Sequence, residues 1–104
     1  MNISLKVGVN ATGIRAELLL GIMVAAGVYE EHDTDLVVTS LVDSKHSVTS
    51  LHYAGAAADL RTRNLPSSAD PALIASEIKK RLTKDYDVIA ESDHIHLEWQ
   101  PRAT

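Results

Sequence analysis

A histidine and an aspartate lie seven positions apart in a stretch that is otherwise rich in small residues. The segment SLHYAGAAADLRT contains His52, Gly55 and Asp59, with alanine at four positions between the two polar side chains. A straight strand would send His52 and Asp59 to opposite faces, because their separation is odd. Gly55 can bend the backbone since it adopts positive φ without steric cost, and the alanines allow neighbouring chain to pack closely. The segment therefore predicts an imidazole and a carboxylate that point toward one position.

A second group of polar side chains follows near the end of the chain, in the segment HIHLEW. On a strand, His94, His96 and Glu98 share one face. The intervening residues are apolar and are expected to face the core: Ile95, Leu97 and Trp99. One histidine of this strand, together with His52 and Asp59, gives a set of two imidazoles and one carboxylate. Such a set suits zinc with a fourth position open to water, as in catalytic zinc sites.

The elements expected to position these side chains form one α+β domain over residues 1–104. A length of 104 residues with 45% hydrophobic content is enough for a core without disulfides or structural metals. Periodicity predicts strands near 3–7, 36–42, 86–91 and 94–100, and helices over 12–31 and from Asp70-Pro71 onward. Ser92 and Asp93 fit a tight hairpin between the last two strands. We expect two helices packed on a mainly antiparallel sheet.

Composition excludes several classes of function. The chain has no cysteine, which rules out thiolate metal sites, cysteine nucleophiles and disulfide frameworks. A net charge of -4 and a pI near 5.6 provide no basic face for nucleic acid. The longest apolar stretch is about half of a membrane span, and the first residues do not form a secretory signal. We therefore expect a protein that is cytoplasmic as synthesised, with no nucleic-acid or membrane partner and an undetermined oligomeric state.

The two motifs together resemble a known family of zinc peptidases. The pattern S-x-H-x-x-G-x-A-x-D over residues 50–59, followed after a predicted helix by H-x-H at 94–96, is similar to that of the zinc D-alanyl-D-alanine carboxypeptidases. Their relatives include the vancomycin-resistance D,D-dipeptidases, the murein endopeptidases, several phage endolysins and the hedgehog signalling domain. The resemblance implies a hedgehog/DD-peptidase-like fold. In compactness the chain looks like the small members from phage and prophage genomes, which implies delivery to the cell wall by a phage lysis or particle route.

The resemblance also assigns roles to individual residues. Carried over position by position, it implies zinc ligands at His52, Asp59 and His96. It implies that Asp93, three residues before His96, is the acidic general base, and that His94 stabilises the oxyanion. The chemistry is coherent, since zinc lowers the pKa of its bound water to about 7 and polarises the scissile carbonyl while a carboxylate transfers the proton to the leaving amine.

A second register of the last motif stays open. Glu91 stands three residues before His94, so an E-x-x-H interpretation would make His94 the ligand and Glu91 the base. We prefer His96 as the ligand, because the terminal ligand of the family is the second histidine of the pair.

Substrate contacts are predicted in the segment before and within the first motif. Ser50 is expected to hydrogen-bond near the site, and His46 lies in a polar loop that is expected to overhang it. Family members that cut peptides ending in D-alanine hold the substrate carboxylate with an arginine before the first motif, and this chain has none between residues 40 and 50. Lys45 can substitute as a point charge, and Arg15 is another candidate.

Three functions from different classes follow. The first is a zinc metallopeptidase that cuts peptidoglycan stem peptides, at D-Ala–D-Ala or L-Ala–D-Glu bonds. The second is a catalytically silent zinc-binding domain with a structural or interaction role in a phage particle. The third is a metal-free α+β module whose histidines are incidental. For Asp59 itself, a salt bridge with Arg61 or Arg63 is an alternative to metal binding, and it leaves His52 and Gly55 unexplained.

Overall fold

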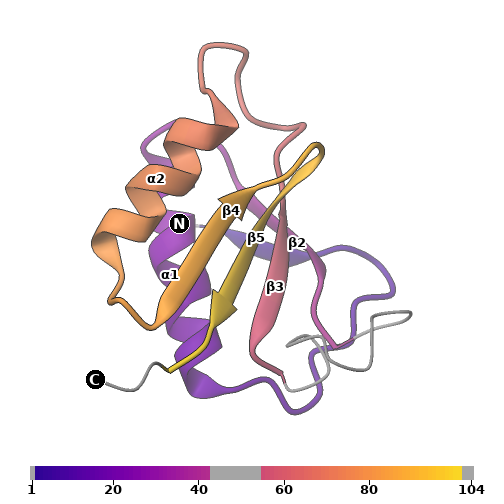
Figure 1. The fold of residues 1–104 in the computed structure, drawn as a ribbon. Helices are drawn as coiled ribbons and strands as arrows, with labels where there is room; N and C mark the ends of the chain where they lie inside the picture. Colours follow the sequence, from indigo (N-terminus) through magenta and orange to yellow (C-terminus); the bar gives the residue numbers. More distant parts are fainter. Residues whose placement is uncertain (1, 43–54, 102–104) are drawn as a thin grey trace.

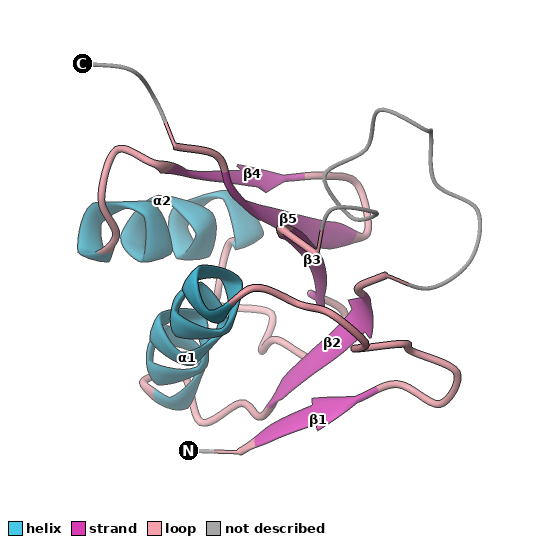
Figure 2. Ribbon diagram, turned by 90° about the horizontal axis from the view of Figure 1, so that it is seen from below, coloured by secondary structure: helices cyan, strands magenta, loops and turns pink. Residues whose placement is uncertain are grey.

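The structure, a computed structural model, describes residues 2–42 and 55–101 as five strands and two helices. In chain order the elements are β1 (Ile3–Leu5), α1 (Ala16–Glu30), β2 (Leu36–Ser40), β3 (Ala57–Arg61), α2 (Pro71–Arg81), β4 (Tyr86–Ala90) and β5 (His94–Trp99). Both helices lie on the same side of the sheet (Figure 1), as the view from below also shows (Figure 2). The predicted α+β class, with two helices on a sheet, is confirmed.

The five strands form one mixed sheet in the order β1-β2-β3-β5-β4. β1 pairs with β2 in parallel, whereas the other three pairings are antiparallel. β3 and β5 are therefore interior neighbours, although 32 residues separate the end of β3 at Arg61 from the start of β5 at His94. Residues on these two strands are held by hydrogen bonds on both sides, which makes them a rigid platform for a site.

The core lies between the helices and one face of the sheet. Ile95 and Leu97 are fully buried there, as predicted, and Trp99 packs partly buried at its margin. Leu19 and Met23 are apolar residues of α1 as well, but they are 46% and 45% exposed, so this side of the helix does not contribute to the core. Fully buried apolar side chains each contribute about 1.5–3 kcal/mol. That burial fixes which face of β5 points inward, so its histidines must point outward.

α1 begins at Ala16 rather than at Thr12, where the periodicity placed its start. The preceding residues form a turn instead, because Asn10 Oδ1 accepts a hydrogen bond of 2.9 Å from the Thr12 N–H. Gly13 follows with a φ of +76°, a value that a right-handed helix does not allow. A local side-chain hydrogen bond and one glycine therefore delay the helix by a turn.

α2 begins as the sequence predicts. Asp70 Oδ1 accepts a hydrogen bond of 3.0 Å from the Ala72 N–H, and Pro71 occupies the first helical position. At its other end, Arg81 contacts both carboxylate oxygens of Glu31 at 2.7 and 2.8 Å, which connects α2 to the end of α1. Neither of the two described helices has the length and apolar content that crossing a membrane requires.

Candidate functional site

The bend predicted at Gly55 is confirmed. Its φ is +70°, and a Cβ at this position would lie 2.4 Å from the carbonyl oxygen of Gly13. The Gly55 carbonyl in turn accepts a hydrogen bond of 2.9 Å from the Arg15 N–H. Two features therefore require glycine at position 55: the positive φ of its backbone and the close approach of the turn before α1. β3 starts two residues later, at Ala57, and leads directly to Asp59.

The register between β3 and β5 gathers the polar side chains on the sheet face opposite the helices. The cross-strand pairs on this open face are Ala57 with Glu98, Asp59 with His96 and Arg61 with His94. Residues directly opposite one another in an antiparallel pair place their side chains on the same face. Two segments that are far apart in the sequence thus present one carboxylate between two histidines.

Asp59 and His96 are in direct contact. Asp59 Oδ1 lies 3.0 Å from His96 Nδ1, and Glu98 Oε1 lies 3.0 Å from His96 Nε2. All three side chains are about one-fifth exposed. The hydrogen bond to Asp59 raises the pKa of His96 above its ordinary value, and Glu98 adds to the effect, although burial opposes it. In the protonated ring each N–H donates to one carboxylate, so two acids fix the orientation of one imidazole.

His94 lies on the other side of the same carboxylate oxygen. Its Nε2 is 3.6 Å from Asp59 Oδ1, and its Nδ1 is 2.6 Å from Asp93 Oδ1. Asp93 stands in the hairpin turn with 85% of its side chain exposed. The turn is closed by a 2.8 Å hydrogen bond from the Glu91 N–H to the His94 carbonyl, which confirms the tight hairpin at Ser92 and Asp93. The two predicted catalytic residues therefore contact each other at the edge of the site.

The donor set of Asp59 and His96 fits two positions of a tetrahedral zinc ion. Ligands about 2.0–2.1 Å from zinc stand about 3.3 Å from one another, close to the 3.0 Å between Oδ1 and Nδ1. Glu98 contacts the far nitrogen of His96, which is where an outer carboxylate would lie if His96 bound a metal. Within residues 2–42 and 55–101, however, no three His, Asp or Glu side chains are grouped so that they could hold a metal ion. The predicted third ligand, His52, lies outside these residues.

Of the four residues predicted to contact substrate, only Arg15 lies within the described part of the chain. Ser50, Lys45 and His46 lie outside the described residues, so their roles stay predictions. Arg15 is described, and its guanidinium stands 5.9 Å from the centre of the Trp99 ring.

The alternative salt bridge of Asp59 is not observed. Among the described residues, neither Arg61 nor Arg63 forms an ion pair, whereas Asp59 contacts both histidines. Glu91, the base of the alternative register, is an exposed residue at the end of the hairpin. His96 is nearer to Asp59 than His94 is, and the choice between the two ligands stays a prediction.

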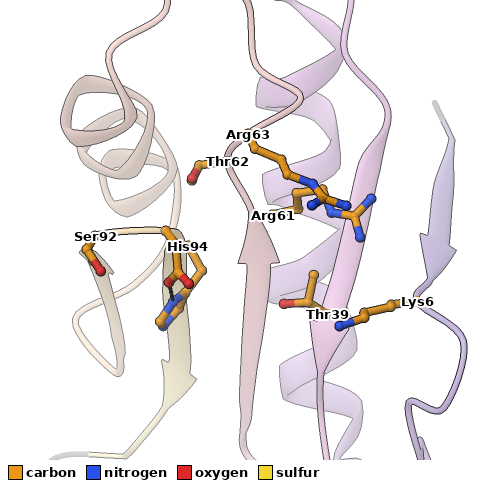
Figure 3. Close-up of a pocket in the computed structure, with 8 residues that line it drawn as sticks. Lys6, Thr39, Arg61, Thr62, Arg63, Ser92 and His94 are labelled. Carbon is orange, nitrogen blue, oxygen red and sulfur yellow. Dashed lines mark hydrogen bonds and ion pairs between the residues drawn. The ribbon is translucent and has the colours of Figure 1, made fainter.

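Sequence reasoning missed two features of this face. Glu98 was placed on the face of the histidines, yet its bond to His96 was not foreseen, although an H-x-E spacing on a strand was a usable signal. The second feature is a cluster of cations beside His94, formed by Lys6, Arg61 and Arg63 around a cavity of about 540 Å³ (Figure 3). No sequence signal identifies this cluster, because Lys6 joins it only through the pairing of β1 with β2.

Comparison with known proteins adds no assignment. The sequence matches no protein-family model, and it matches no curated protein.

Proposed function

We propose that this protein is a zinc-dependent peptidase with a hedgehog/DD-peptidase-like fold, and that it hydrolyses peptide bonds in peptidoglycan stem peptides. The observation that carries the proposal is the contact between Asp59 Oδ1 and His96 Nδ1 at 3.0 Å, on directly opposed residues of interior strands. These are two of the three residues that the motif resemblance names as zinc ligands. The third, His52, belongs to the segment that the Gly55 bend leads into.

The polar residues have separable roles in this proposal. Asp59, His96 and His52 would hold zinc, which when bound supplies Lewis acidity toward a peptide carbonyl and makes water a nucleophile near neutral pH. Glu98 keeps the His96 ring in one orientation. His94, whose Nε2 lies 3.6 Å from Asp59 Oδ1, would donate a hydrogen bond to a developing oxyanion. Asp93 would accept the proton of the attacking water and return it to the leaving amine.

Features of the described residues on the open face suit a peptide substrate. No described helix covers it, and the cavity beside His94 has a volume of about 540 Å³. On the other side of the site, Ile89 lies directly opposite His96 and leaves 50% of its surface exposed. A substrate that crosses the site would thus meet an apolar side chain on one side and a polar cavity on the other.

Incubation of the zinc-loaded protein with purified sacculi, followed by mass analysis of released peptides, tests the proposal. We expect released peptides that identify the cleaved bond, and no release by the Asp59→Asn variant. Stoichiometric zinc without any released peptide would contradict hydrolysis.

One observation favours the second candidate, a zinc-binding domain that does not hydrolyse peptides. Asp93 is 85% exposed and its Oδ1 already contacts His94 Nδ1, whereas an efficient general base is aimed at its substrate. The same sacculus experiment separates the two candidates, because only the first requires turnover.

A further inference from the structure

Three positively charged side chains meet beside the site, and each comes from a different position in the sheet. Arg61 is the last residue of β3 and lies directly opposite His94 on β5. Arg63 follows two residues later. Lys6 follows β1, and its N–H donates a 2.9 Å hydrogen bond to the Val38 carbonyl of β2. All three line the same cavity, which Figure 3 shows extending from His94 across the end of β3.

The cations have no acidic partners in the described part of the chain. No ion pair or hydrogen bond involves the side chain of Lys6, Arg61 or Arg63 there, whereas Arg81 is bound by two glutamates. Of the described residues that line the cavity, Asp93 is the one acid, and its Oδ1 contacts His94. Among the described residues, three cations therefore line one cavity in a chain whose net charge is -4. Positive charges gathered in one cavity raise the local concentration of anions there.

The backbone holds this cluster in place. The carbonyl of Arg61 accepts a 2.7 Å hydrogen bond from the hydroxyl of Tyr29, which is fully buried in α1. The end of β3 is thus fixed to the core directly below the two arginines. Three hydroxyl residues complete the lining: Thr39, Thr62 and Ser92. Guanidinium groups bind carboxylates with paired hydrogen bonds, and hydroxyls add single donors.

We propose that this cavity is a subsite that binds a carboxylate of the peptide substrate, with Arg61 and Arg63 as the principal contacts and Lys6 as a supporting charge. The proposal rests on the proposed peptidase function and deepens it, because it assigns the substrate an acidic group on the His94 side of the scissile bond.

The test compares three N-acetylated peptides. The first ends in D-Ala–D-Ala as the free acid, and the second is the same peptide with an amidated C-terminus. The third is amidated and has one internal D-glutamate, which separates a side-chain carboxylate from a terminal one. Binding to the metal-free protein is measured by NMR titration, so that the result does not depend on turnover. Wild type is compared with Arg61→Gln, Arg63→Gln, Arg63→Lys and the matched control Lys80→Gln, which removes an exposed charge on α2.

We expect at least one of the two acidic peptides to bind about 10- to 100-fold more tightly than the amidated peptide without glutamate, with shifts at the amides of residues 61–63. Arg61→Gln and Arg63→Gln should each abolish most of this preference, Arg63→Lys should keep part of it, and Lys80→Gln should keep all of it. Thermal unfolding of each variant identifies any variant that fails to fold. If Arg61→Gln fails to fold, the variants of the exposed residue Arg63 still test the proposal. Equal binding of all three peptides, or a preference that survives both arginine variants, would overturn the subsite. A preference for acid without release of peptides from sacculi would instead retain the subsite and refute the peptidase.

Discussion

Asp59 Oδ1 lies 3.0 Å from His96 Nδ1, across directly opposed positions of β3 and β5. The pair belongs to interior strands, and Glu98 holds the far side of the imidazole. The arrangement holds two potential metal ligands in a fixed geometry. When no cation is bound, a proton lies between Asp59 Oδ1 and His96 Nδ1. The predictions below follow from this pair and from the backbone features that position it.

Removal of either member of the pair should abolish tight zinc binding. We expect Asp59→Asn and His96→Gln to weaken zinc affinity strongly, because each deletes one ligand of a three-ligand set. Glu98→Gln should cost about 10- to 100-fold, the usual effect of losing an outer carboxylate. Isothermal titration with zinc measures all three. His32→Gln, which changes an exposed histidine outside the site, is the matched control. Unchanged affinity in His96→Gln would favour His94 as the ligand.

The general base can be identified by two carboxamide variants. We expect Asp93→Asn to keep zinc and to lower kcat by about 10²- to 10⁴-fold, the usual contribution of general base catalysis. Glu91→Gln should stay near wild-type activity. Peptide release from sacculi, measured beside zinc content, distinguishes the two. The reverse pattern would establish the E-x-x-H register.

Stability of the metal-free protein should depend on pH through His96. The contact with Asp59 raises the pKa of His96 above its ordinary value of 6.5. Protonated His96 therefore stabilises the fold fully below pH 6.5, and this contribution is lost as the pH rises through the folded-state pKa. Urea unfolding in the presence of a chelator should show a gap between wild type and Asp59→Asn that narrows from pH 6 toward alkaline pH. A gap that widens with pH would contradict the assigned contact.

The bend before β3 should tolerate no side chain. Gly55→Ala combines a φ of +70° with a contact of 2.4 Å to the Gly13 carbonyl, so we expect a loss of about 2–4 kcal/mol in the free energy of unfolding. Gly27→Ala is the matched control, since its added Cβ meets nothing within 4 Å inside α1. That variant should gain about 0.5–1 kcal/mol. Chemical denaturation measures both, and similar effects of the two would refute the strain argument.

The end of α1 offers a stabilising substitution. Asp33 has a φ of +53°, and the bonds from Asp33 N–H to Glu30 and from Thr34 N–H to Tyr29 form a Schellman motif. Glycine is preferred at this position, and the change also removes a negative charge from a helix C-terminus. We expect Asp33→Gly to raise the free energy of unfolding by about 0.5 kcal/mol, measured by chemical denaturation. A lower stability than wild type would show that the Asp33 side chain has a role not captured by its backbone.

Local signals in the sequence account for much of the fold. The start of α2 at Asp70 and Pro71, the bend at Gly55 and the outward face of His94 and His96 depend on neighbouring residues, and all are confirmed. The delayed start of α1 depends on the hydrogen bond that the Thr12 N–H donates to Asn10 Oδ1 and on the positive φ of Gly13, neither of which a periodicity argument includes.

The site is less predictable because it depends on pairing between distant strands. The sequence indicated that Asp59 and a histidine would converge, but the one-to-one register with His96 is set by the whole sheet. Local sequence patterns do not predict the cationic cavity at all, because Lys6 and Arg61 come together only through the pairing of β1 and β3 with β2.

The most direct test of the central claim is a crystal structure of the zinc-loaded protein, with the metal located by anomalous scattering. The account predicts one zinc ion within about 2.0–2.2 Å of Asp59 Oδ1, His96 Nδ1 and a ring nitrogen of His52. A zinc ion bound elsewhere, or one bound by Asp59 and His96 without His52, would contradict it.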